Sequence, residues 1–322
     1  MSERVLVTGA AGFAGGHLLD CIEQDPRLDI VAWRRPGEPL PAGRSEADSA
    51  IRWVTLDLRD REAVNAAVAD ARPRLIYHLA GAAHVGDAWT KTAETLAINA
   101  LGTHYLIDAL RRCGLQPRML IPSSAYVYQP SEGAIDEDAP VRPNSPYGLS
   151  KLAQELIGRK AVEQDGISVV ISRSFNHVGP RQAPSFSTSS FARQIATIEI
   201  GRAEPVMLVG NLSARRDLTD VRDTVRAYRM ILERGTPGRV YNVCSGVARV
   251  VSDVLQGLLA EARVRIEVRV DPARLRPNDT PLVLGDFTRL RNELGWRPEI
   301  PFERTLHDLL DFWRGLVGMQ DT

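Results

Sequence analysis

The chain has 322 residues, and its 40 acidic and 40 basic side chains give a formal net charge of zero. This balance excludes a general electrostatic attraction to nucleic acid or to an anionic membrane. The length suits one large domain or two modest ones. We find no apolar signal core after Met1 and no run long enough to span a bilayer. The three cysteines are scattered in apolar segments, so we expect a cytoplasmic protein with reduced thiols and no metal site.

The first predicted element is a buried strand over residues 4–8, which runs directly into a glycine-rich turn and then into a helical pattern. Gly9, Gly12 and Gly15 have the spacing Gly-x-x-Gly-x-x-Gly, with Phe13 inside it. Such a turn lets the backbone approach a pyrophosphate, and the N-H groups at the start of the helix point at it. A plain tight turn is the alternative, but the position after an N-terminal strand favours a dinucleotide site.

The second predicted strand, residues 29–33, ends in Arg34 and Arg35, where an acid would bind the adenosine ribose of NAD. Two guanidinium groups at this point favour the 2'-phosphate of NADPH over NADH, although a solvated surface pair is the alternative. A third strand over residues 52–56 delivers Asp57 and Leu58, which we expect to bracket the adenine.

A fourth strand over residues 75–81 includes Leu79 and ends in the small residues Ala80 and Gly81, which leave room for a cofactor at the carboxyl edge of the sheet. A fifth strand over residues 118–121 is followed by Pro122, Ser123 and Ser124. Open parallel sheets bind ligands at this edge, so the Ser124 hydroxyl is placed to donate to a substrate oxygen.

Tyr147 and Lys151 lie four residues apart, so in a helix their side chains share one face. A phenol titrates near about 10, and an adjacent cation pulls its pKa toward neutrality. The pair is therefore a candidate acid and base for catalysis. The alternative is an aromatic ring packed on the aliphatic stem of a surface lysine.

Together these motifs resemble the extended short-chain dehydrogenase/reductases, the NAD-dependent epimerase/dehydratase family that acts on nucleotide sugars. Matching pieces occur in the family's order: the glycine turn, Asp57-Leu58, residues 78–80, Asn99 before Gly102-Thr103, residues 123–128, and Tyr147 with Lys151. In the second half, the segments that resemble members acting on GDP-mannose derivatives are residues 173–180, 209–212, 215–217, 220–223, 241–246 and 271–277. They are most similar to the reductases of GDP-4-dehydro-6-deoxy-D-mannose, which make GDP-D-rhamnose.

The resemblance implies Ser124, Tyr147 and Lys151 as catalytic residues, with NADPH or NADH as the cofactor and Asn99 among the cofactor-binding residues. It implies a GDP-sugar substrate, for which Ser124 also binds the sugar. The other implied substrate-binding residues are His84, Asn176, Arg193, Asn211, Arg216 and Arg276. For each single arginine a surface salt bridge is the alternative reading.

The dehydratases of this family carry a glutamate two residues after the active-site serine or threonine, because loss of water needs a further proton carrier. This chain has Tyr126 there, which favours simple hydride transfer at C4. A nucleotide-sugar 4-epimerase with tightly bound NAD stays open, as does a non-catalytic dinucleotide-binding regulator, which typically lacks the tyrosine or lysine. Gln129 and Arg181 stand where the family usually has glycine, and we expect both near the sugar.

Alternating strands and helices predict an α/β fold: a Rossmann-like, doubly wound parallel sheet with a smaller α/β substrate-binding domain. We expect residues 1–172, plus about 218–245, to bind NAD(P), and residues 173–217 and 246–322 to bind the nucleotide sugar. The segments 36–49 and 179–190 read as flexible loops. The resemblance also implies a homodimer through a four-helix interface, formed by the helices over residues 99–112 and 147–163.

Overall fold

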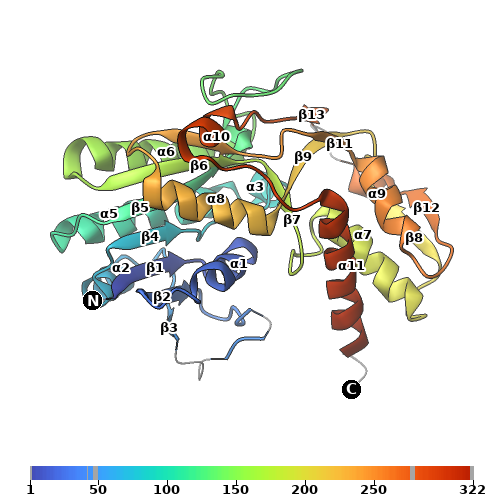
Figure 1. The fold of residues 1–322 in the computed structure, drawn as a ribbon, viewed down its shortest axis with the longest axis horizontal. Helices are drawn as coiled ribbons and strands as arrows, with labels where there is room; N and C mark the ends of the chain where they lie inside the picture. The colour runs from blue at the N-terminus through green and yellow to red at the C-terminus, as the bar shows by residue number, and fades with distance from the viewer. Residues whose placement is uncertain (1, 42, 46–49, 276–279, 320–322) are drawn as a thin grey trace.

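A seven-stranded sheet forms the centre of the computed structural model, which describes residues 2–41, 43–45, 50–275 and 280–319. All neighbouring strands of this sheet are parallel. This confirms the predicted doubly wound sheet (Figure 1). In spatial order its strands are β10 (Val240–Val243), β6 (Ser168–Ser174), β5 (Arg118–Ser124), β4 (Leu75–His78), β1 (Glu3–Thr8), β2 (Leu28–Arg34) and β3 (Ile51–Thr55).

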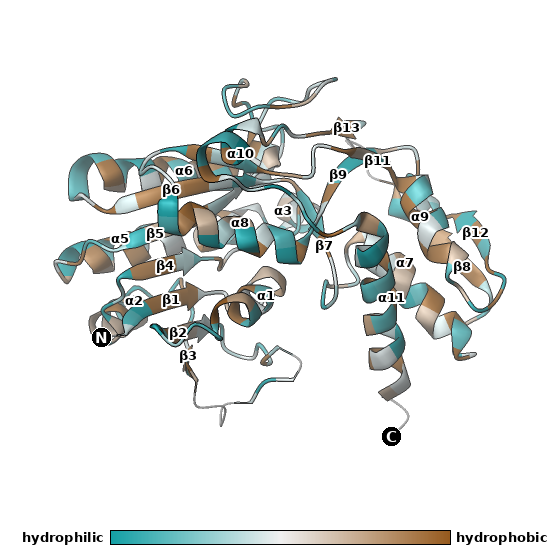
Figure 2. Ribbon diagram, viewed as in Figure 1, coloured by the Kyte–Doolittle hydropathy of each residue, from teal (hydrophilic) through white to brown (hydrophobic). Residues whose placement is uncertain are grey.

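Helices cover both faces of this sheet, because the apolar side chains of each central strand alternate between two cores. In β1, Val5 and Val7 join the core under α1 (Phe13–Ile22) and α8 (Val221–Arg234). Leu6 joins the opposite core, under α2 (Arg61–Ala71), α5 (Gly102–Arg112) and α6 (Pro146–Asp165). Figure 2 shows the apolar strands lying between helices that carry both hydrophilic and hydrophobic residues.

The carboxyl ends of the parallel strands meet along one edge of the sheet. Thr8 of β1 is in register with His78 of β4, and Ser124 of β5 is in register with Ser174 of β6. Short helical segments follow this edge: α3 (Asp87–Thr90), α4 (Thr92–Leu96), a π-helical turn (Ala97–Leu101) and a 3-10 turn (Ala125–Val127). The topology therefore brings the predicted cofactor and catalytic segments to the same edge.

A second, smaller lobe lies beside that edge (Figure 1). Its core is formed mainly by α7 (Ser187–Glu199), α9 (Val251–Ala260) and α11 (Phe302–Gly318). One small sheet of this lobe pairs β8 (Val206–Val209) with β12 (Glu267–Val270). A four-stranded sheet contains β7 (Asn176–Val178), β9 (Arg215–Asp220), β11 (Ala248–Val250) and β13 (Leu282–Val283).

Two local expectations differ from the structure. Helix α10 (Thr288–Leu294) and Trp296, assigned from the sequence to the smaller domain, pack in the core of the large sheet. The Trp296 indole N-H donates to the backbone oxygen of Asp223 on α8 at 3.1 Å, which holds this segment against the large sheet. The expected loop over residues 179–190 ends early, because α7 already begins at Ser187. Among the described helices, none is long and apolar enough to cross a membrane.

Candidate active site

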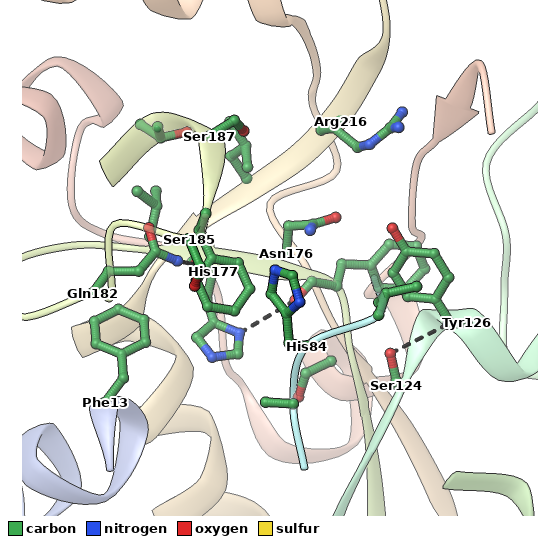
Figure 3. Close-up of a pocket in the computed structure, with 18 of the residues that line it drawn as sticks. Phe13, His84, Ser124, Tyr126, Asn176, His177, Gln182, Ser185, Ser187 and Arg216 are labelled. Atoms are coloured by element: carbon green, nitrogen blue, oxygen red, sulfur yellow. Dashed lines mark hydrogen bonds between the residues drawn. The ribbon is translucent and has the colours of Figure 1, made fainter. Parts of the chain in front are cut away.

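A cavity of about 710 Å³ lies between the carboxyl edge of the large sheet and the second lobe. The large-sheet side contributes the glycine turn, the ends of β4 and β5, and the start of α6. The second lobe contributes residues of β7, β9 and the start of α7. Figure 3 shows side chains from both sides meeting in this cavity, including Phe13, Ser124, Asn176 and Arg216.

The glycine turn has two positions, Gly9 and Gly15, at which no other residue type would fit. Gly9 has a φ of +65°, and a Cβ atom there would lie 2.6 Å from the backbone of Ala80. A Cβ atom on Gly15 would lie 2.2 Å from the backbone oxygen of Gly9. Helix α1 begins at Phe13 without a side-chain cap, so its first N-H groups can bind another acceptor. This geometry fits the pyrophosphate of a dinucleotide.

The three predicted catalytic side chains all line this cavity. Tyr147 and Lys151 lie one turn apart on α6, which begins with Pro146 after the cap Ser145. The Ser145 hydroxyl accepts a hydrogen bond from the backbone N-H of Gly148 at 3.1 Å, which fixes the start of this helix. Ser124 ends β5 opposite them. The structure therefore brings together groups that the sequence places 27 residues apart, from 124 to 151.

The electrostatics of this trio differ from the expectation. Burial raises the pKa of Tyr147 to about 12, which a hydrogen bond with Ser124 partly opposes. Burial also lowers the pKa of Lys151 to about 8. The Lys151 ammonium donates a hydrogen bond to Oε1 of Gln154. The expectation that Lys151 pulls the Tyr147 pKa toward neutrality is thus not met: desolvation of the phenolate dominates, and the phenol keeps its proton at neutral pH.

Most of the cofactor residues predicted in the glycine turn and after β4 line the cavity, and the others lie behind its wall. Gly9, Gly12, Phe13, Gly15, Leu79 and Gly81 line the cavity. Ala80 packs against the core, and its N-H donates to the Thr8 hydroxyl at 3.1 Å. Asn99 lies on the π-helical turn, and its Oδ1 accepts from the N-H of Ala82 at 2.8 Å. Ala80 and Asn99 therefore support the cavity wall from behind.

The residues expected around the adenosine lie outside the cavity lining. Nε of Arg34 donates to the Thr55 hydroxyl at 3.0 Å, and the Arg35 side chain is 74% exposed. Asp57 is paired with Arg59, which holds the pKa of its carboxyl below the usual range. The Leu58 side chain is buried in the core. Leu58 thus packs inward, and an adenine contact from it would have to come from its backbone.

Four of the predicted substrate residues beside Ser124 line the cavity: His84, Asn176, Asn211 and Arg216. Nε2 of His84 and Oδ1 of Asn176 are buried without a hydrogen-bond partner, as expected of groups that await a ligand. Arg193 is not among the lining residues, because its guanidinium lies over the ring of Trp313, 5.8 Å from the centroid. Arg276 falls outside the described residues.

His177 and Gln182 are among the cavity side chains that sequence reasoning missed. The His177 ring stacks on the Phe13 ring with 5.6 Å between centroids, which joins β7 to the glycine turn. Oε1 of Gln182 is buried without a partner and faces the same cavity. His177 lies inside the segment 173–180 that carried the family resemblance, so its position was the available signal.

Gln129 and Arg181, both expected near the sugar, lie elsewhere. Gln129 is exposed, and its N-H donates to the backbone oxygen of Pro140. Arg181 has a φ of +71°, a left-handed conformation that explains why glycine suits this position. The Arg181 guanidinium forms an ion pair with Asp20 on α1 instead of lining the cavity.

Comparisons with known proteins agree with this geometry. The family model described as GDP-mannose 4,6 dehydratase matches residues 6–309. The chain is 35% identical to the GDP-6-deoxy-D-mannose reductase of Pseudomonas aeruginosa, over 98% of this chain and 99% of that protein. The solved structure of RMD from Pseudomonas aeruginosa complexed with NADPH superimposes with a TM-score of 0.83 at 33% identity, covering 98% of this chain and 100% of that one. A Thermus thermophilus UDP-glucose 4-epimerase in complex with NAD gives a TM-score of 0.84 at 28% identity, covering 97% and 99%.

Proposed function

Because the chain belongs to the GDP-mannose 4,6-dehydratase family, we propose that it reduces the C4 ketone of GDP-4-dehydro-6-deoxy-D-mannose, or of a close GDP-4-keto-6-deoxyhexose. The product is GDP-D-rhamnose, and the cofactor is NADPH or NADH. Full-length similarity to a GDP-6-deoxy-D-mannose reductase supports this substrate. The observation that carries the choice of reaction is Tyr126 in the cavity wall.

Tyr126 separates reduction from dehydration within the family. A dehydratase needs a carboxylate at this position to move the protons of the departing water. Tyr126 has a phenol there, and its ring contacts the ring of Tyr147 edge-on. A phenol is a much poorer base than a carboxylate for moving protons at neutral pH. Position 126 therefore lacks the carboxylate that a dehydratase uses, while Ser124, Tyr147 and Lys151, the three groups that reduction requires, all line the cavity.

Each of these three groups has a defined role in the reduction. The bound cofactor supplies the hydride for C4. Tyr147 donates its proton to the alkoxide that develops on the C4 oxygen, and its raised pKa means that it is protonated when the substrate arrives. Ser124 donates a hydrogen bond to the same oxygen and so orients the ketone. The Lys151 ammonium stabilises the Tyr147 phenolate that remains after proton transfer and holds the cofactor ribose.

The second lobe offers groups for the nucleotide diphosphate. Arg216 extends into the upper part of the cavity in Figure 3, above Asn176. Its Nη1 donates to the backbone oxygens of Arg215 and Thr280, at 2.9 and 2.7 Å, which holds the guanidinium at the cavity, where its positive charge suits a diphosphate. Asn211 also lines the cavity and is proposed to contact the guanosine.

The glycine turn would hold the pyrophosphate of the cofactor, and Tyr147 and Lys151 would hold its nicotinamide ribose. Arg34 is the last residue of β2 and Arg35 is the next residue, so their charges favour the 2'-phosphate of NADPH. The similarity to an enzyme solved with NADPH supports the same preference. NADH is the alternative cofactor, because a similar solved structure holds NAD.

A nucleotide-sugar 4-epimerase would use the same serine, tyrosine and lysine, and one solved relative is a UDP-glucose 4-epimerase with NAD. The test is to incubate purified protein with GDP-4-keto-6-deoxymannose and NADPH and to follow the absorbance of the reduced cofactor. We expect one cofactor consumed per product. No absorbance loss, together with interconversion of UDP-sugars without added cofactor, would establish the epimerase instead.

Tyr147→Phe is the matched variant for this assay. It removes the phenol hydroxyl and keeps the ring, so turnover should fall by about 10²–10⁴-fold, while the affinity for NADPH stays close to that of the wild type. Wild-type turnover in this variant would overturn the assignment of Tyr147 as the proton donor.

The same proposal includes a homodimer. Leu101, Leu149 and Leu156 lie on the π-helical turn and α6, and their exposed fractions are 49%, 50% and 54%. Large apolar side chains exposed together on neighbouring helices favour a protein interface. Each subunit would contribute one such pair of helices, and the two pairs would form the four-helix interface expected from the family resemblance.

A further inference from the structure

Gln154 is fully buried on α6 and lies three residues after Lys151. Its Oε1 accepts a hydrogen bond from the Lys151 ammonium, and its Nε2 donates to the Thr103 hydroxyl at 2.8 Å. Rotating the carboxamide by half a turn would place an NH₂ group against an ammonium, so its orientation is fixed. The two hydrogen bonds of the Gln154 carboxamide therefore keep its oxygen directed at Lys151.

The Thr103 hydroxyl determines the direction of the neighbouring hydrogen bonds. It donates its one proton to the backbone oxygen of Asn99 at 2.7 Å. It must therefore accept from both Gln154 and Nε2 of His78, which lies 2.9 Å away. This assigns the proton of the neutral His78 ring to Nε2.

The other side of His78 leads to the glycine turn. Its Nδ1 accepts from the Thr8 hydroxyl at 2.9 Å, and Thr8 in turn accepts from the N-H of Ala80 at 3.1 Å. Thr8 is the residue before Gly9. Burial lowers the pKa of His78 to about 3, so the ring stays neutral near neutral pH. The donors and acceptors in this series of hydrogen bonds therefore keep their roles. A buried, fully ordered network therefore connects the pyrophosphate cradle with Lys151.

The charges around Lys151 leave Gln154 as its direct acceptor. Glu155, the next acidic residue on α6, forms a buried ion pair with Arg173 of β6 at 2.8 Å. His78 of β4 is neutral, and Tyr147 keeps its proton. In the described parts of the chain, no carboxylate lies within ion-pair distance of Lys151.

We propose that Gln154 is a positioning residue, which holds the Lys151 ammonium one helical turn from Tyr147 and keeps it charged. This role rests on the proposed function, because it is the reduction that needs a charged Lys151. Removing the acceptor should favour the neutral amine, and replacing it by a carboxylate should favour the ammonium.

Competitive labelling of lysines with acetic anhydride tests this directly. The sequence contains only three lysines, Lys91, Lys151 and Lys160, so each labelled peptide is distinct by mass spectrometry. Labelling across pH 6–11 is compared in the wild type, Gln154→Met and Gln154→Glu. We expect the pKa of Lys151 to fall by about one unit with methionine and to rise by about one unit with glutamate. The exposed Lys160 serves as the internal reference and should not move.

Gln116→Glu is the matched charge control, because it adds the same carboxylate at an exposed position. It should leave Lys151 unchanged. If Gln154→Met fails to fold, Gln154→Glu decides alone, since its predicted rise is independent of the other variant. An unchanged Lys151 pKa in the folded Gln154 variants would overturn the proposal.

Activity gives the second measurement. The pH above which kcat for sugar reduction falls should change in the same order. It should be lowest in Gln154→Met, intermediate in the wild type and highest in Gln154→Glu. A purely space-filling role for Gln154 would lower kcat in both variants without moving this limb, and that result would also overturn the proposal. The labelling requires no substrate. A wild type that fails to reduce the sugar therefore refutes the proposed function alone, whereas unmoved labelling in an active enzyme refutes the role of Gln154 alone.

Discussion

The ring of Tyr126 stands edge-on to the ring of Tyr147, with 6.1 Å between their centroids and an interplanar angle of 77°. The backbone N-H of Tyr126 also donates to the Ser124 hydroxyl at 3.3 Å, so Tyr126 contacts two of the three catalytic residues (Figure 3). It packs against the reacting groups with an aromatic face where a dehydratase requires a carboxylate.

Tyr126→Phe preserves this ring contact, so kcat should stay within about threefold of the wild type in a steady-state assay. Tyr126→Glu places a carboxylate beside Tyr147, which makes its phenolate less stable. We expect kcat/KM for reduction to fall by about tenfold or more, since each unit of pKa corresponds to about a factor of ten. An equal loss in both variants would mean that the Tyr126 hydroxyl takes part in the reaction.

The pH dependence of reduction should follow Lys151. Its pKa is lowered to about 8, so the ammonium is present below that pH and is lost as the pH rises through it. The rate should therefore be level near neutrality and fall above about pH 8, while Tyr147, with its pKa near 12, remains protonated throughout. Lys151→Arg should remove this limb in whatever activity it retains, because a guanidinium stays charged. A rate that increases from pH 7 to pH 9 would contradict these roles.

The choice of cofactor should depend on Arg34 and Arg35. Replacing both by alanine should raise KM for NADPH by about tenfold or more, because a charge-assisted contact to phosphate contributes about 1.5–3 kcal/mol. KM for NADH, which lacks the 2'-phosphate, should change by less than about threefold. Arg52→Ala on the neighbouring β3, where the arginine pairs with Asp70, is the control. An equal rise in KM for NADPH and for NADH would refute the proposed contact with the 2'-phosphate.

The proposed dimer should depend on α6. Leu156→Glu places a charge on an exposed apolar surface, and sedimentation velocity should then detect monomers where the wild type forms dimers. Val264→Glu, at a similarly exposed position in the second lobe, should leave the association unchanged. A wild type that sediments as a monomer at micromolar concentration would refute the interface.

The large sheet and its glycine turn could be predicted because their signals are local. Buried parallel strands are short apolar runs, and the approach of Gly9 and Gly15 to the backbone excludes every side chain. The Tyr147 and Lys151 pair was also recognisable, since helical spacing alone places both side chains on one face.

The features that escaped prediction depend on contacts between distant segments. Trp296 returns to the first core because its indole finds Asp223 on α8, a contact that no local pattern specifies. The raised pKa of Tyr147 reflects burial, which depends on how the whole cavity is enclosed. Arg193 has a side chain that suits a phosphate group, but its guanidinium packs over the Trp313 ring of α11 and not in the cavity.

Transfer of deuterium tests the proposed reaction most directly. The enzyme is given GDP-4-keto-6-deoxymannose and NADPH that carries deuterium at both C4 positions, and the product is examined by NMR. We predict a GDP-6-deoxyhexose with one deuterium at C4 of the sugar and an equal amount of oxidised cofactor. A product without deuterium at C4, formed while the added NADPH remains unconsumed, would contradict the assignment as a C4 ketone reductase.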